Sequence, residues 1–415
     1  MTTPSLSRRL GLGDAVLIGL GSMIGAGVFA VFAPAAAAAG TGLLIGLGIA
    51  AVVAFGNATS TAQLAAVHPT SGGVYAYGRA ELGPWWGFVA GWGFVIGKLA
   101  SCAAMALTFA VYAAPAGWER PVAAVAVVAL GAVNWFGITR TALATRIVVV
   151  VVLSALAIAV AAGTAASPTA AVPVLHGLGD AGWYGILQSA GLIFFAFAGY
   201  ARIATLGEEV RDPSRTIPRA IVGAFIGALA VYAVVAVTVL RVLGPEGTAA
   251  TADPVAAMAA ASGWPWVEPV ARIGAAAACL GALLALIAGI GRTGFAMARE
   301  GDLPRGLAAV HPRWRVPHRA EAAAVAIVVV VVTFAELRLA IGFSSLGVLL
   351  YYLIANIAAF GQHGSARRYP RVLQMIGGVG CGVLAVTLPW QAVVAGVLVV
   401  VVGVGYRLIR LRRRG

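Results

Sequence analysis

Charged side chains are scarce in this 415-residue chain: 10% of the residues are charged, whereas 61% are hydrophobic. A soluble domain typically carries about a quarter charged residues, so a water-soluble fold is excluded and lipid is the expected solvent. The net charge of +14 does not indicate nucleic-acid binding. Its basic residues form short clusters between apolar runs and at Arg407–Arg414, which is a membrane topology pattern. We expect an integral membrane protein in the lipid bilayer, with no nucleic-acid partner.

Cysteine is almost absent, and the residue patterns of catalysis are absent as well. Cys102, Cys279 and Cys381 stand apart in apolar runs, without a disulfide framework or metal-ligand spacing. The five histidines lie at loops or at the ends of apolar runs, and none has His-x-x-x-His spacing. We therefore expect no enzyme activity, no bound metal and no cofactor.

Long apolar runs, in contrast, fill most of the chain. A helix needs about 20 mostly apolar residues to cross a bilayer. Such runs predict an all-α integral membrane protein of about 12 transmembrane helices in one domain over 1–415. The expected spans lie near 13–39, 43–67, 85–114, 121–137, 144–164 and 184–207, and then near 217–242, 268–297, 320–336, 341–361, 372–388 and 391–408.

The arginines predict the orientation in the membrane. If the N-terminus is cytoplasmic, the expected outer loops hold just Arg120, Arg241 and Arg338, and the inner loops and the two ends collect most of the others. An excess of basic residues marks cytoplasmic loops. We expect a multi-pass protein of the plasma (inner) membrane with both termini in the cytoplasm.

Glycine interrupts two of the expected spans. The first contains four glycines in the nine residues Gly19–Gly27, and the sixth contains Gly199 shortly before the charged Arg202. A glycine inside a helix costs roughly 1 kcal/mol relative to alanine and frees the backbone to unwind. Glycine-interrupted spans at matching positions of two halves indicate a transporter binding site. Close helix packing through small residues is the alternative.

Five motifs follow one another in order: Gly19–Phe29, Pro69–Tyr77, Phe194–Tyr200, Glu208–Pro218 and Ala296–Pro304. With these motifs, over roughly residues 10–370, the chain resembles the amino acid–polyamine–organocation (APC) superfamily of permeases. The resemblance implies a LeuT-type fold with two inverted repeats, 13–164 and 184–361, followed by two further helices in 372–408. It also implies broken helices 1 and 6 and a secondary active transporter of amino acids that works by alternating access.

The resemblance also implies a substrate site at the two breaks. The substrate carboxylate would bind backbone amides, where a half-helix N-terminus favours an anion. The amino group would bind carbonyl oxygens, and Phe195 would serve as an aromatic gate, although ordinary helix packing also explains that phenylalanine. The implied amide donors are Ser22, Met23, Ile24 and Gly25; the implied carbonyls are those of Gly19, Phe195 and Ala198, and Tyr200 completes the site.

The residues that would couple transport to an ion are unusual. Residues 275–291 of the eighth span contain no serine or threonine, so the hydroxyl ligands of a sodium site are missing. Some proton-coupled members of the family carry a lysine on helix 5, where this sequence has Val152. Proton coupling by that route is therefore in doubt, which leaves proton coupling or exchange open.

Two cations are expected inside the membrane. Lys98 is the only lysine of the chain and stands near the middle of its span. A charge at that depth costs about 2.5–3.5 kcal/mol, so we expect Lys98 to take part in coupling or gating, with a carbonyl-bonded structural lysine as the alternative. Arg202 is expected to face the pocket or a vestibule, or to pair with a carboxylate. These cations favour a neutral amino acid as the substrate.

Functions of other classes stay open at this point. A receptor or sensor on a permease fold would share the pocket without net flux, and a light chain of a heteromeric transporter carries no distinguishing mark. Import, export and exchange are equally compatible with the sequence, as is a homodimer.

Overall fold

The computed structural model describes residues 10–68, 72–136, 142–166, 175–204 and 210–412. These residues form helices and no strand, apart from a single parallel bridge between Leu10 and Val210. The all-α fold class is therefore confirmed for the described part of the chain. Two pieces of the sequence motifs, Pro69–Ser71 and Glu208–Glu209, lie outside the described residues.

The first half of the chain contains α1 (Leu12–Ile24), α2 (Gly27–Ala30), α3 (Phe32–Ala39), η1 (Gly40–Gly42), α4 (Leu43–Val67), α5 (Gly73–Leu82), α6 (Pro84–Ala113), α7 (Glu119–Trp135) and α8 (Ala142–Ala165). The second half contains α9 (Gly182–Phe197), η2 (Ala198–Tyr200), α10 (Ala201–Ala204), α11 (Pro213–Ala250), α12 (Pro254–Ala260), α13 (Val267–Arg299), η3 (Arg305–Ala308), α14 (His318–Phe334), α15 (Leu337–Gly361), η4 (Gly364–Ala366), α16 (Arg371–Thr387) and α17 (Trp390–Arg412).

Nine helical segments in the described part of the chain are long and apolar enough to cross a membrane. This confirms the membrane-spanning character. Three further helices, α7, α14 and α16, have 17 residues each and fall just short of that length. The number of about 12 spans, the division into 13–164, 184–361 and 372–408, and the inverted repeat therefore stay predictions.

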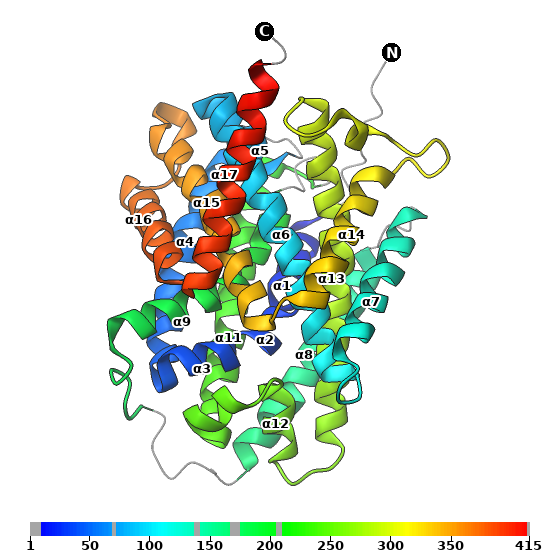
Figure 1. Cartoon of the computed structure of the whole chain (residues 1–415). Coiled ribbons are helices and arrows are strands. Elements are labelled where there is room, and N and C mark those ends of the chain that lie inside the picture. The colour runs from blue at the N-terminus through cyan, green and yellow to red at the C-terminus, as the bar shows by residue number, and fades with distance from the viewer. Residues whose placement is uncertain (1–9, 69–71, 137–141, 167–174, 205–209, 413–415) are drawn as a thin grey trace.

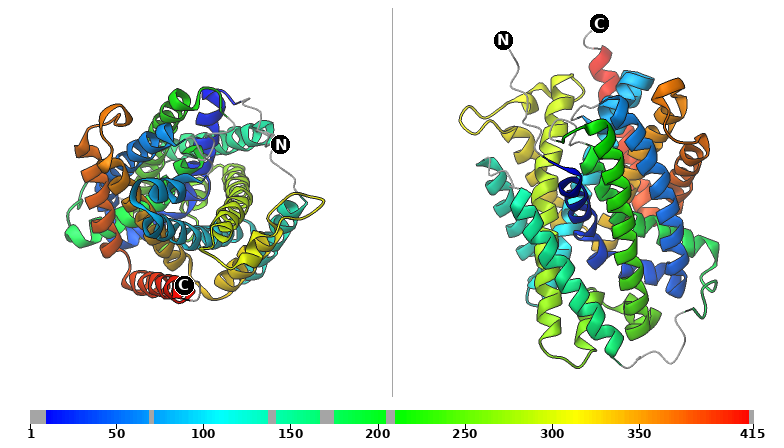
Figure 2. Two further views of the ribbon diagram at one scale, coloured as in Figure 1. Left: turned by 90° about the horizontal axis from the view of Figure 1, so that it is seen from above. Right: turned by 180° about the vertical axis from the view of Figure 1, so that it is seen from behind.

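The long helices form a bundle with two distinct ends (Figure 1). We call one the α5 end; it carries α5, the C-terminal end of α17 and the connection between α13 and α14. The opposite end carries α12, and we call it the α12 end. Seen along the bundle, α17 lies at the periphery, whereas α6 and α13 lie farther inside (Figure 2).

The inner helices approach closely because small residues face one another. A Cβ atom on Gly347 of α15 would come within 2.7 Å of the Gly93 carbonyl oxygen and of the Gly97 Cα on α6. The Gly93-x-x-x-Gly97 spacing places both glycines on one face of α6, so the two backbones touch. This contact fixes α6, which carries Lys98 toward the centre of the bundle.

Candidate functional site

Two interrupted helices meet in the middle of the bundle. Helix α1 ends at Ile24, and Gly25 has φ −24° and ψ −127° before the chain becomes helical again at Gly27. Helix α9 ends at Phe197 and continues through η2 into α10. A Cβ atom on Gly199 of η2 would come within 2.2 Å of the Ser22 carbonyl oxygen, so this approach requires glycine. The glycines that drew attention in the sequence thus stand at two interruptions in direct contact.

A buried hydroxyl group joins the two interruptions. Tyr232 of α11 donates a hydrogen bond to the Met23 carbonyl oxygen at 2.7 Å, and its hydroxyl oxygen lies 2.9 Å from the Ala196 carbonyl oxygen. The last carbonyls of a helix lack intrahelical partners, and here one tyrosine serves the ends of α1 and α9. The sequence analysis missed Tyr232.

Lys98 reaches the second interruption from α6. Its side chain is buried, and its Nζ donates a hydrogen bond to the Ala198 carbonyl oxygen at 3.3 Å. The Tyr352 hydroxyl of α15 donates to the same oxygen at 3.5 Å. Ala198 is one of the residues whose carbonyl the resemblance assigns to the substrate amino group. In this conformation, that carbonyl oxygen accepts a hydrogen bond from the amino group of Lys98.

A cavity of about 850 Å³ lies beside the interruptions. Its walls come chiefly from α1, α6, α8, α9, η2, α10, α13 and α14, and no described residue of α3 or α12 lines it. Eight of the ten residues expected in the substrate site or in coupling line this cavity: Ser22, Met23, Ile24, Gly25, Lys98, Phe195, Ala198 and Arg202. The cavity therefore brings together most of the residues on which the sequence analysis depended.

Two expected site residues lie elsewhere. Gly19 packs toward Ile203 and Ala224, since a Cβ atom there would lie within 3 Å of both side chains. Tyr200 is fully buried and stacks on Tyr352, with ring centroids 5.0 Å apart. The structure brings neither residue to the cavity wall.

The expected amide donors are engaged in this conformation. Ser22, Met23 and Ile24 belong to α1, whose hydrogen-bond ladder uses their amides, and the Gly25 amide donates to the Gly21 carbonyl oxygen at 3.3 Å. The four residues border the cavity, and their role in carboxylate binding stays a prediction.

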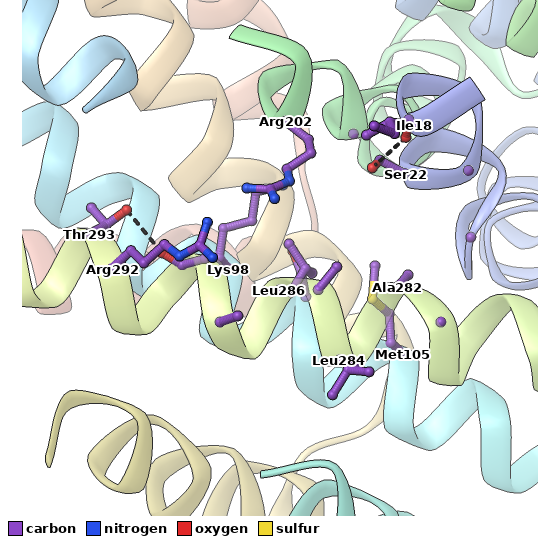
Figure 3. A pocket seen from close by; sticks show the side chains of 18 of the residues that line it. Ile18, Ser22, Lys98, Met105, Arg202, Ala282, Leu284, Leu286, Arg292 and Thr293 are labelled. Atoms are coloured by element: carbon purple, nitrogen blue, oxygen red, sulfur yellow. Dashed lines mark hydrogen bonds between the residues drawn. The ribbon is translucent and has the colours of Figure 1, made fainter. Parts of the chain in front are cut away.

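Charged and apolar side chains divide the cavity wall between them. Lys98, Arg202 and Arg292 point into the cavity from α6, α10 and α13 (Figure 3). Val149, Val152 and alanines of α13 contribute aliphatic side chains to the cavity wall. The wall carries one described carboxylate, Glu321 of α14, which the sequence analysis missed.

Side-chain hydrogen bonds and ion pairs connect the helices at the α12 end of the bundle. The Tyr112 hydroxyl donates to the Phe29 carbonyl oxygen at 3.1 Å, and the two rings lie edge to face. Arg272 donates to the Tyr112 carbonyl oxygen at 3.3 Å and forms ion pairs with Asp253 at 2.8 Å and Glu268 at 2.9 Å. The described lining of the cavity extends instead toward the α5 end, where it includes Arg299 and Arg315.

A model of the amino acid permease family matches residues 14–406. The chain belongs to the amino acid permease family. It is thus a transporter within the APC superfamily, as the sequence motifs predict.

Relatives of the permease agree with this family. An uncharacterised transporter of Mycobacterium tuberculosis is 57% identical over 412 residues, covering 98% of this chain and 93% of the relative. A branched-chain amino acid permease of Bacillus subtilis is 27% identical and covers 76% of this chain and 72% of its own length. The human cationic amino acid transporter 4 is also 27% identical, with 84% of this chain and 58% of the relative covered.

In this permease, Glu321 is the residue most at odds with ordinary packing. Its side chain is 4% exposed, its Oε2 atom is buried, and no described residue donates a hydrogen bond to the carboxylate. Its aliphatic stem lies against Gly291, where a Cβ atom would come within 2.5 Å, and Arg292 is close enough to act on it electrostatically. A buried carboxylate without hydrogen-bond donors is costly for the fold, which makes Glu321 a candidate for function.

A second buried carboxylate of the permease has the opposite surroundings. Asp302 Oδ2 accepts hydrogen bonds from the Tyr75 hydroxyl at 2.9 Å and from Arg79 at 3.0 Å, and Oδ1 accepts one from Arg407 at 2.5 Å. We call these four residues the Asp302 cluster. Burial and the neighbouring Asp302 charge raise the pKa of Tyr75 above its usual range. The cluster ties α5, the end of α13 and α17 together at the α5 end.

Proposed function

We propose that this permease is a secondary active transporter that moves amino acids across the plasma membrane by alternating access. One observation carries the proposal: two interrupted helices meet beside a cavity whose described lining includes residues of the α5 end and none of α3 or α12. Interrupted helices supply backbone groups at mid-membrane, and a path closed at one end corresponds to one state of an alternating cycle. The M. tuberculosis relative, named as a transporter, supports the same proposal.

The proposed orientation places the α5 end in the cytoplasm. Most of the arginines lie in the described loops and helix ends at this end, including Arg299, Arg305 and Arg315. Cytoplasmic loops are typically enriched in basic residues, which supports this orientation. Both termini are then cytoplasmic, and this conformation faces inward. Opening of the α12 end would require release of the ties between Arg272 and the residues Asp253 and Tyr112.

In the proposed site, the substrate amino group competes with Lys98 for the Ala198 carbonyl oxygen. A primary ammonium group and the Lys98 side chain have the same chemistry, so both are suited to that acceptor. Arrival of the substrate would release Lys98 and loosen the link between α6 and η2. This makes Lys98 a gating residue, with Phe195 beside it in the cavity wall. The amides of Ser22–Gly25 would become available to the carboxylate when α1 unwinds further.

The cavity favours a neutral side chain. The cations Lys98 and Arg292 disfavour an amino acid with a positively charged side chain, because like charges at close range repel strongly in a low-dielectric site. The aliphatic wall around Val149 and Val152 suits an apolar side chain. Residues 275–291 of α13 carry no serine or threonine hydroxyl, which argues against sodium, so we propose proton coupling or exchange as the driving process.

Uptake of radiolabelled amino acids into proteoliposomes tests the proposal. The panel includes neutral, acidic and basic amino acids, each with an inward proton gradient and separately with unlabelled amino acid trapped inside. Accumulation of a neutral amino acid under the gradient identifies a proton symporter, and flux only with trapped amino acid identifies an exchanger. Net efflux from loaded vesicles, but no uptake, would identify an exporter.

A matched control uses Gly199→Ala, since the added methyl group collides with the Ser22 carbonyl and should abolish flux in a folded protein. Preferred uptake of a basic or acidic amino acid would contradict the neutral side chain. Binding without flux in every arm would contradict transport and favour a sensor.

A further inference from the structure

A second, smaller pocket lies at the α5 end, and its lining shares no residue with that of the large cavity. Its volume is about 100 Å³, and it is lined by three arginines, two carboxylates, a glycine and a leucine: Arg79, Arg407, Arg410, Glu300, Asp302, Gly301 and Leu411. The three guanidinium groups outnumber the two carboxylates. The pocket therefore has one positive charge in excess.

Arg407 is the deepest of these cations. Its side chain is 6% exposed, and its guanidinium carbon lies 4.8 Å from the Trp85 ring centroid and 4.7 Å from that of Phe88. One nitrogen, Nη1, is bound to Asp302. The buried Nε has no hydrogen-bond partner among the described residues. A buried donor without an acceptor is rare in native proteins, so it indicates an acceptor from outside the chain.

The carboxylates of the pocket do not supply that acceptor. Both oxygens of Asp302 are already bound within the Asp302 cluster, and Glu300 is bound to Arg79 at 3.4 Å. Arg410 donates to the Leu303 carbonyl and to the Tyr406 hydroxyl through one nitrogen, Nη1. Its other donors have no partner in the described part of the chain. A guanidinium group with free donors matches the paired oxygens of a phosphate.

The position of the pocket favours a lipid headgroup over a free phosphate ion as its ligand. Helix α17 lies at the periphery of the bundle (Figure 2). Only 22% of its most apolar stretch is buried inside the protein. Apolar side chains such as Val401, Val402 and Leu408 are exposed along it, as expected of a helix that faces lipid. The pocket stands at the end of this helix, where the sequence becomes basic through Arg412, Arg413 and Arg414. Basic clusters beside a span attract anionic headgroups.

We propose that this pocket binds the phosphate of an anionic phospholipid headgroup, with Arg407 Nε and Arg410 as the donors. The lipid would complete the hydrogen bonding of the Asp302 cluster. It would thereby strengthen the tie between α17 and α5.

Lipid binding by the whole purified protein tests this site. Native mass spectrometry and thermal unfolding in detergent would be measured with phosphatidylglycerol, with phosphatidylcholine and with inorganic phosphate alone. The variants are Arg410→Gln and, as a matched control, Arg305→Gln, which removes an arginine at the same end but outside the pocket. We expect tighter binding of phosphatidylglycerol than of phosphatidylcholine. Arg410→Gln should weaken the phosphatidylglycerol complex about fivefold, while Arg305→Gln leaves it unchanged.

Each remaining outcome overturns part of the proposal. Equal loss in both variants would mean that the general positive charge of this end attracts the lipid, without a built pocket. Binding of inorganic phosphate that equals binding of the lipid would make a soluble anion the ligand. Should Arg410→Gln fail to fold, Arg410→Lys is tested instead, because it keeps the positive charge and loses the planar guanidinium group. Full retention of lipid preference in that variant would then contradict recognition by the guanidinium group.

Discussion

Asp302 and Glu321 are the two buried carboxylates in the described part of the permease, and their surroundings are opposite. Asp302 receives three hydrogen bonds, two of them from arginines, and lies where three helical elements meet. Glu321 receives no hydrogen bond from the described residues and lines the large cavity. The same contrast separates the buried cations, because Arg407 is paired with a carboxylate, whereas Lys98 is bonded to a backbone carbonyl.

The contrast shows which charges serve the fold and which remain available to a substrate. Removing one partner of a buried ion pair leaves a buried charge without its countercharge, which is costly, so Asp302 and Arg407 are fixed in place. A charged group with few partners is free to exchange them during a transport cycle. The ion-paired Asp302 and Arg407 therefore belong to a structural tie, whereas Lys98 and Glu321 line the proposed transport path.

The largest expected effect comes from breaking the paired side of this comparison. Asp302→Asn leaves Arg407 buried without a countercharge, so we expect a loss of about 3–5 kcal/mol in the free energy of unfolding. Chemical unfolding in detergent, followed by tryptophan fluorescence, measures this loss. A loss of unfolding free energy smaller than that caused by replacing an exposed acidic residue would show that the Asp302 cluster does not stabilise the fold.

The next effect concerns transport. Lys98→Met removes the ammonium group from the Ala198 carbonyl and keeps an unbranched side chain that is shorter by one atom. We expect initial uptake about tenfold slower, which corresponds to about 1.4 kcal/mol, and a loss of its pH dependence. Ser101→Ala, one turn away on the same cavity wall, serves as the control and should keep both properties. Wild-type pH dependence in Lys98→Met would exclude Lys98 from coupling.

A smaller effect is expected from Glu300, the exposed neighbour of Asp302. The Glu300 side chain is 46% exposed, and its oxygen lies 3.4 Å from Arg79. Exposed ion pairs contribute about 0–1 kcal/mol, so Glu300→Gln should change the unfolding free energy by less than that. The same unfolding experiment compares it with Asp302→Asn. A similar loss in both variants would mean that burial does not separate the two acids.

The smallest effect on stability is expected from Glu321, although it is buried. Glutamine resembles a neutral glutamic acid and breaks no hydrogen bond at this position, so Glu321→Gln should change the unfolding free energy by less than about 0.5 kcal/mol. We expect the substitution to act on transport instead, because it removes a group that changes partners during the cycle. Uptake measured from low to high pH should therefore differ from that of the unaltered protein. A loss as large as that of Asp302→Asn would show that Glu321 is ionised and paired.

The sequence predicts the parts of this structure that depend on backbone chemistry. Gly25 and Gly199 predict the interruptions, and the lone charge of Lys98 predicts a special position, because few residue types fit such places. Helical phase explains why Gly21 but not Gly19 lines the cavity in this conformation, because the two residues are about 200° apart around α1.

The residues that the sequence analysis missed depend on tertiary contacts. Tyr232 stands in an apolar run, where an aromatic residue normally indicates packing, and its two carbonyl partners come from helices distant in sequence. Glu321 follows the basic stretch Arg313–Arg319 and resembles the polar end of a span. Only the packing of α14 on Gly291 buries this carboxylate beside the cavity.

Accessibility of the cavity tests the central claim most directly. Ala282 lines the cavity, and the native cysteines Cys102, Cys279 and Cys381 are buried, so Ala282→Cys offers one reactive thiol for a membrane-impermeant reagent. Ala366→Cys, in η4 outside the cavity, is the control. We predict labelling of Ala282→Cys from the cytoplasmic side and its protection by the amino acid with the highest uptake, with no protection of Ala366→Cys. Labelling that the transported amino acid leaves unchanged would contradict this cavity as the substrate site.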